Sequence, residues 1–220
     1  MIPAQEALER LEEGNRRFVA SIRNRDPDPN GAKRVELVRE QQPFAIVLGC
    51  SDARVPAEIV FDQGLGDLFV IRVAGNIVAP SQIGSVEFAA SRFGTRLVVV
   101  LGHSQCGAIL ATIEELQRPA EKQSRNLRSI VDRVRPAVEG LLKTEISHDM
   151  PALVRHAVRF NVSVAASHLR YGSEILEALI HNEGLRIVGA EYSLETGEVE
   201  FFDGLDSIGT AALGADEARP

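Results

Sequence analysis

The sequence lacks the features that mark several large classes of protein. It contains no tryptophan and only two cysteines, Cys50 and Cys106, in 220 residues. Small secreted proteins that depend on disulfides carry more cysteines in shorter chains, so a disulfide framework is not expected. The two cysteines also lie far apart in the chain, which argues against a C-x-x-C redox motif.

Long apolar runs and an excess of positive charge are also missing. No apolar stretch approaches the roughly 18 residues that a membrane-spanning helix needs. Residues 1–18 are charged and lack the apolar core and cleavage site of a signal peptide. The net charge is -7, whereas nucleic acids and anionic membranes require a basic face. We therefore expect a cytoplasmic protein with reduced cysteines and with no nucleic-acid or membrane partner.

Three short runs rich in Val, Ile, Leu or Phe indicate the strands of a parallel sheet. They lie at residues 44–49, 68–73 and 97–102. They show little alternation between apolar and polar residues, which is typical of strands buried on both faces. Residues 81–94 have apolar positions at helical spacing and predict a crossover helix between the second and third strands. This pattern predicts an α/β fold with a mostly parallel central β-sheet flanked by helices.

Helical periodicity predicts further helices around these strands. They are expected at residues 4–22, 33–41, 109–116, 127–142 and 151–182, the last of them bent near Gly172. The first helix is amphipathic, so its apolar side would face either the core of the chain or a partner. The predicted fold includes this helix as an N-terminal helical arm, which could embrace a partner.

The C-terminal part predicts a β-hairpin. The apolar runs 185–192 and 198–202 are joined by a turn at 194–197, and the last strand is expected to be an antiparallel edge of the sheet. The tail 204–220 is rich in Gly, Ala and Asp and is expected to be loose. Without a repeat or a convincing linker, we expect residues 1–220 to form a single domain.

Potential metal ligands follow two of the predicted strands. Cys50 follows the first strand in the sequence C-S-D-A-R, and His103 and Cys106 follow the third in G-H-S-Q-C. Ligand sites in α/β sheets lie beyond the carboxyl ends of parallel strands, so these side chains are expected to meet. Two thiolates and one imidazole suit zinc, and three protein ligands leave the open fourth position that marks a catalytic zinc site.

Each of these residues also has an ordinary interpretation. A buried cysteine is commonly an inert small apolar residue, and an H-x-x-C spacing often arises by chance. Asp52 could take the fourth place on the metal or accept a hydrogen bond from a bound water, and Asp52 and Arg54 could equally form a structural ion pair. The occurrence of both motifs at the ends of two buried strands favours a metal site.

The sequence resembles the β-class carbonic anhydrases. Residues 50–78 and 98–109 carry the resemblance, the predicted helix at 7–19 adds to it, and the likeness extends from about residue 4 to about residue 202. It implies reversible, zinc-dependent hydration of carbon dioxide to bicarbonate and a proton. It also implies a homodimer or a dimer of dimers.

The resemblance implies a role for each residue of the two motifs. Cys50, His103 and Cys106 would bind one Zn²⁺ per subunit. Asp52 and Arg54 would form a catalytic pair in which Arg54 keeps Asp52 ionised and oriented. Asp52 would also be a possible fourth zinc ligand in a closed state.

Two further residues match the family's substrate pocket. Gln41 resembles a glutamine that hydrogen-bonds the substrate, often across a subunit boundary, and Phe69 resembles an apolar wall. Gln41 could instead be a solvated helix end and Phe69 an ordinary core residue. Two other functions remain open: hydrolysis of carbonyl sulfide or carbon disulfide on the same zinc site, and zinc binding without catalysis.

Overall fold

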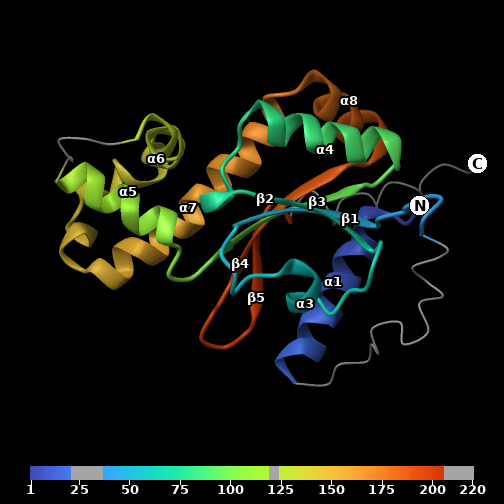
Figure 1. Ribbon diagram of the computed structural model, residues 1–220, viewed down its shortest axis with the longest axis horizontal. Coiled ribbons are helices and arrows are strands. Elements are labelled where there is room, and N and C mark those ends of the chain that lie inside the picture. Colours follow the sequence, from blue (N-terminus) through green and yellow to red (C-terminus); the bar gives the residue numbers. More distant parts are fainter. Residues whose placement is uncertain (21–36, 119–123, 206–220) are drawn as a thin grey trace, which may run out of the picture.

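The computed structural model describes residues 1–20, 37–118 and 124–205 (Figure 1). Within them, five strands form one sheet in the order β2-β1-β3-β4-β5. The strands are β1 (Ala45–Gly49), β2 (Leu68–Arg72), β3 (Leu97–His103), β4 (Arg186–Tyr192) and β5 (Val199–Asp203). The first four are parallel to one another and β5 runs antiparallel to β4 at the edge. The predicted mostly parallel sheet with an antiparallel edge strand is therefore confirmed.

The two central strands carry the residues that matter most for the site. Every residue of β1 and β3 is buried, as their continuous apolar sequences predict for strands covered on both faces. In the register between them, Gly49 pairs with Leu101, so the two strands end at the same edge of the sheet. The residues that follow β1 and β3 are thereby brought side by side.

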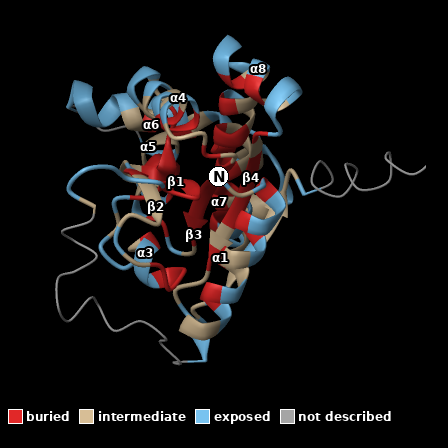
Figure 2. Cartoon of the chain, turned by 90° about the vertical axis from the view of Figure 1, so that its right-hand side faces the viewer, coloured by how far each residue is buried: buried red, intermediate tan, exposed pale blue. Residues whose placement is uncertain are grey.

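Helices cover both faces of the sheet (Figure 1). One face packs against α1 (Ala4–Val19) and α3 (Ala57–Val60). The other packs against α4 (Pro80–Arg92), α7 (Met150–Tyr171) and α8 (Glu174–Glu183). A third apolar cluster joins α7 to α5 (Gly107–Gln117) and α6 (Arg125–Val138). Figure 2 shows the central strands and the inward helix faces buried and the outward helix faces exposed.

The helix predictions hold with three differences. The predicted helix 4–22 ends as α1 at Val19, and residues 21 and 22 lie outside the described residues. The predicted helix 127–142 ends as α6 at Val138, and a 3-10 turn, Leu141–Lys143, follows it. The predicted helix at 33–41 lies partly outside the described residues, and residues 37–39 form a turn. The C-terminal tail from residue 206 onwards is also outside the described residues. No helix in the described ranges is long and apolar enough to cross a membrane.

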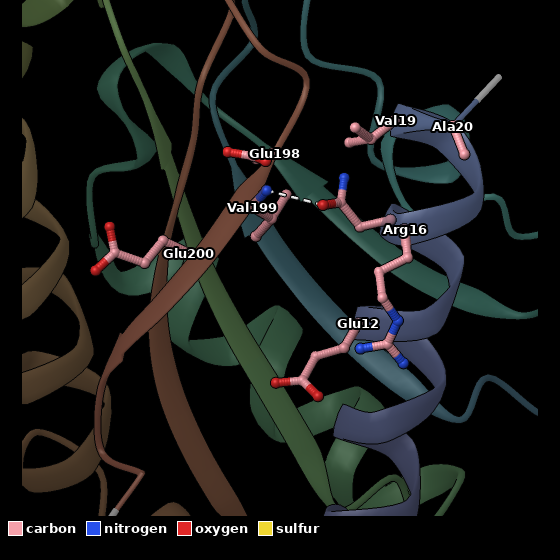
Figure 3. A pocket seen from close by; sticks show the side chains of 8 residues that line it. Glu12, Arg16, Val19, Ala20, Glu198, Val199 and Glu200 are labelled. Carbon is pink, nitrogen blue, oxygen red and sulfur yellow. Dashed lines mark hydrogen bonds between the residues drawn. The ribbon is translucent and has the colours of Figure 1, made fainter.

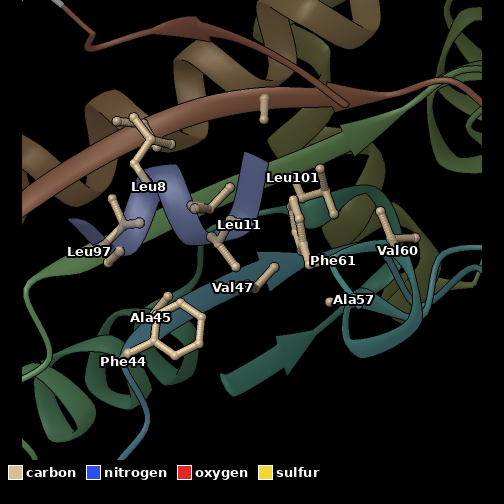
Figure 4. Packing of buried hydrophobic residues seen from close by; sticks show 14 of the residues in the cluster. Leu8, Leu11, Phe44, Ala45, Val47, Ala57, Val60, Phe61, Leu97 and Leu101 are labelled. Atoms are coloured by element: carbon tan, nitrogen blue, oxygen red, sulfur yellow. The ribbon is translucent and has the colours of Figure 1, made fainter. Parts of the chain in front are cut away.

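Helix α1 packs against its own chain. Leu8 and Leu11 are buried against the sheet, in the cluster that also contains Val47 and Leu101 (Figure 4). At Gly14 the helix comes so close to the α3 segment that a Cβ atom would lie 1.8 Å from the carbonyl oxygen of Phe61. The apolar side of the predicted first helix thus faces the core of this chain.

Buried Asn15 ties α1 to the hairpin between β4 and β5. Its side-chain amide donates hydrogen bonds to the carbonyl oxygens of Val60 and Gly197, at 3.1 and 2.9 Å. Its oxygen accepts a hydrogen bond of 2.8 Å from the amide of Val199, drawn as the dashed line in Figure 3. A groove of about 590 Å³ lies between α1 and β5 and is lined by Arg16 and Glu200 among others. Figure 3 shows these side chains on the two elements.

Candidate metal centre

Three potential metal ligands converge where β1 and β3 end. Cys50 follows β1, His103 is the last residue of β3, and Cys106 is the residue before α5. All three residues are buried, and one ligand atom of each lies within 4.8 Å of the other two. Ligands held at 2.0–2.3 Å in a zinc tetrahedron are about 3.6–3.8 Å apart, so small shifts would close this group around an ion.

The imidazole of His103 is oriented for metal binding. Its Nδ1 lies 2.8 Å from the carbonyl oxygen of Ser104, which fixes Nδ1 as the nitrogen that carries the proton. The lone pair of Nε2 is then available, and this buried atom has no hydrogen-bond partner among the described residues. A buried polar atom without a partner is unusual in a protein, and metal coordination would satisfy it.

The two cysteines influence each other's ionisation. The hydrogen bond with Cys106 lowers the pKa of Cys50 to about 4, against the opposing effect of burial, and His103 contributes in the same direction. The Gly75 amide also donates to the Cys50 sulfur, at 3.3 Å. The hydrogen bond with Cys50 and the burial of the Cys106 thiol both raise the pKa of Cys106. The chain alone therefore stabilises one thiolate, and a cation is needed to hold two.

Asp52 and Arg54 form a two-point ion pair beside this cluster. The guanidinium donates to the two carboxylate oxygens at 2.9 and 2.7 Å, and the Arg54 amide adds a third hydrogen bond of 3.0 Å. These contacts hold the pKa of Asp52 well below its usual range. One carboxylate oxygen lies 3.9 Å from Nε2 of His103. Among the described residues, the group of converging ligand atoms does not include Asp52.

Arg72 is a residue of the site that the sequence interpretation missed. It ends β2 level with Gly49, and its guanidinium donates to the carbonyl oxygens of Cys50 and Asp52, at 2.9 and 2.5 Å. These bonds fix the backbone carbonyl groups on either side of Ser51. The sequence did show a charged residue at the end of an apolar strand, which could have marked Arg72 as a residue of the site. What Arg72 contacts is shown only by the register of the strands.

Gln41 and Phe69 do not lie beside the cluster in the same chain. Phe69 pairs with Ile46, four residues before Cys50, which corresponds to about 13 Å along the strand. Its ring packs against Phe88 and Phe93. Gln41 is exposed and precedes β1, at the opposite end of the sheet from the cluster. The structure thus brings together five of the seven predicted site residues.

A family model described as carbonic anhydrase matches residues 45–199, from the first residue of β1 to the first residue of β5. The chain belongs to the β-class carbonic anhydrase family. The fold and the Cys-His-Cys cluster described above are in keeping with this assignment.

Curated relatives match over nearly the whole chain. A carbonic anhydrase of Mycolicibacterium smegmatis is 39% identical over 203 residues, which cover 92% of this chain and 95% of the relative. Carbonic anhydrase 2 of Mycobacterium tuberculosis is 37% identical over 206 residues, with the same coverage of 92% and 95%. The chain is therefore an enzyme of the carbonic anhydrase class, whose general reaction is the hydration of carbon dioxide.

Solved structures show the same fold. The β-carbonic anhydrase CcaA superposes with a TM-score of 0.68 at 27% identity, covering 92% of this chain and 90% of that one. One of two tetrameric β-carbonic anhydrases from Sordaria macrospora gives a TM-score of 0.70 at 21% identity, covering 79% and 87%. This second likeness concerns the fold alone.

Proposed function

We propose that Cys50, His103 and Cys106 bind one zinc ion and that the chain uses it to interconvert carbon dioxide and bicarbonate. The observation that carries this proposal is the buried cluster of two sulfurs and one unpartnered imidazole nitrogen. Two thiolates and one imidazole suit a borderline-soft ion, and three protein ligands leave one coordination position for chemistry. When bound, zinc supplies the Lewis acid that activates water near neutral pH.

The Asp52–Arg54 pair provides the orienting group that such a reaction needs. Arg54 holds both carboxylate oxygens, so Asp52 stays ionised and points in one direction. Its oxygen near His103 has a lone pair that can accept a hydrogen bond from the reacting water. Arg72 keeps this arrangement in place through the Cys50 and Asp52 carbonyl groups. Together, these three side chains would orient the reacting water.

Asp52 as a fourth ligand in a closed state remains a prediction. To reach the ion, the carboxylate would have to leave its two hydrogen bonds with Arg54. We expect such a closed state to reduce activity as the pH falls. A low-pH crystal structure in which Asp52 is still paired with Arg54 beside a bound zinc ion would contradict it.

The function is tested by stopped-flow measurement of carbon dioxide hydration on protein whose zinc content has been quantified. We expect one zinc per chain, activity at neutral to alkaline pH, loss of activity after chelation, and recovery after zinc is added back. Carbonyl sulfide and carbon disulfide are assayed in parallel, because faster turnover of either would favour the hydrolase alternative. Full zinc loading without any turnover would support a non-catalytic zinc protein instead.

We also propose that a second copy completes the substrate pocket. Gln41 lies at the opposite end of the sheet from the metal cluster, so this side chain would reach a pocket in another subunit. Light scattering is expected to show a dimer or a dimer of dimers, and a monomer at assay concentration would contradict this proposal. The cytoplasmic location expected from the sequence stays a prediction.

A further inference from the structure

Ser104 connects the imidazole of His103 to the hairpin between β4 and β5. Its carbonyl oxygen accepts the hydrogen bond from Nδ1 of His103 at 2.8 Å. Its amide donates to the carbonyl oxygen of Tyr192 at 2.9 Å. Its hydroxyl donates to the carboxylate of Glu195 at 2.7 Å and accepts from the amide of Leu194 at 3.0 Å. All the polar groups of Ser104 are therefore occupied, and three of the four bonds go to residues 192–195.

The segment after Ser104 needs such support. Gln105 has φ of 55°, a left-handed conformation that is uncommon for a residue other than glycine. Conformations of this kind persist where the surrounding contacts hold them in place. Cys106 follows immediately, so the backbone conformation at 104 and 105 sets the direction of both His103 and Cys106.

The hairpin that holds Ser104 is itself anchored. Asn15 of α1 bonds to Gly197 and Val199, and Phe18 packs on Gly197, where an added Cβ would lie 3.2 Å from the Phe18 ring. The hydrogen bond from Ser104 lowers the pKa of Glu195, so this carboxylate is ionised at neutral pH. A charged acceptor strengthens the bond to the serine hydroxyl. A continuous set of contacts thus runs from α1 through the hairpin to the candidate metal ligand.

We propose that Ser104 is a positioning residue for the metal centre and that the hairpin 193–198 supports it through Glu195. This inference rests on the proposed zinc site. Without the serine hydroxyl, residue 104 loses its bonds to Glu195 and Leu194 and keeps the amide bond to Tyr192, so the carbonyl group that accepts the His103 proton is held less firmly and the imidazole is oriented less strictly. Groups that hydrogen-bond the ring nitrogen of a metal-binding histidine that does not face the metal typically contribute 10–100-fold to metal affinity or activity.

The test is the rate at which zinc leaves the loaded protein in the presence of an excess of a chromophoric chelator. We expect Ser104→Ala to release zinc about 10-fold faster or more, and Ser104→Thr, which keeps the hydroxyl, to restore a rate near that of the wild type. Ser129→Ala is the matched control, because Ser129 is exposed on α6 and its hydroxyl donates to the carbonyl oxygen of Asn126 in the same helix. Its release rate is expected to equal that of the wild type.

Glu195→Ala separates the role of the hairpin from that of the serine. The Glu195 side chain is exposed, so its removal leaves the core intact, and we expect zinc release to accelerate in the same direction as in Ser104→Ala. Wild-type release from Ser104→Ala would overturn the inference, and wild-type release from Glu195→Ala would overturn the part played by the hairpin. Should Ser104→Ala fail to fold, the Glu195 variant still decides the hairpin role. Wild-type protein that binds no zinc would contradict the proposed function instead.

Discussion

Replacing Cys50 with serine is expected to remove zinc from the protein and to reduce carbon dioxide hydration by about 10³-fold. Cys50 is one member of the buried thiol pair in which the chain itself stabilises a single thiolate. A serine hydroxyl stays protonated at neutral pH and is a poor ligand for zinc. Loss of a Lewis acid that contributes several kcal/mol to the transition state corresponds to a rate effect of this size. Zinc content by atomic absorption and stopped-flow rates measure the two effects.

Ser51 provides the control for this substitution. It is adjacent to Cys50 in the same segment, and its side chain is exposed. Ser51→Ala is therefore expected to keep both its zinc and its activity. A Cys50→Ser protein that retains one zinc per chain and the wild-type rate would show that the metal is held elsewhere or that catalysis does not need it.

Replacing Asp52 with asparagine is expected to reduce the turnover rate by about 100-fold while the protein keeps its zinc. Asparagine has nearly the same shape, but it lacks the charge that pairs with Arg54 and presents an N–H group where a carboxylate oxygen stood. The reacting water then loses its charged acceptor, and contributions of this kind are worth about 10²–10⁴-fold. Zinc content is expected to stay unchanged because the converging ligand atoms do not include Asp52.

An ion pair on α6 provides the matched control. Asp132 is exposed and pairs with Arg135 at 3.1 Å, three residues along the same helix. Asp132→Asn is expected to leave turnover unchanged, as is typical of exposed ion pairs. Equal rates for wild type and Asp52→Asn would show that Asp52 only has a structural role.

The Asp52–Arg54 pair also predicts a pH dependence of stability. Because the folded protein holds the pKa of Asp52 below its ordinary value, the pairing stabilises the fold at every pH above about 4. The contribution is lost as the pH falls below that value and the carboxylate is protonated in the folded state. Urea unfolding of wild type and Asp52→Asn is expected to differ near neutral pH and to converge in strong acid. The difference is expected to be small, since the side chain of Arg54 is 56% exposed.

The sequence alone determined the strands, the sheet type and the convergence of the candidate metal ligands. β1 and β3 are apolar throughout because both of their faces are covered, and a run of this kind is recognisable without knowing what covers it. Cys50 and His103 follow such runs, and neighbouring parallel strands present their carboxyl ends at one edge. The apolar runs and the rule that parallel strands present their carboxyl ends at one edge were therefore enough to predict that these candidate ligands meet.

Only the tertiary structure decided which residues support the cluster and which lie far from it. The contacts of Arg72 depend on the register of β2 against β1, and those of Ser104 depend on a hairpin about 90 residues away in the chain. The amphipathic pattern of α1 shows that one side is buried, and the packing shows that it is buried against its own sheet. Phe69 is apolar, as a residue of a pocket wall would be. However, it pairs with Ile46 in the sheet, which places it far from Cys50. Sequence periodicity specifies which face of an element is buried, whereas the contacts between distant segments depend on how all the elements pack at once.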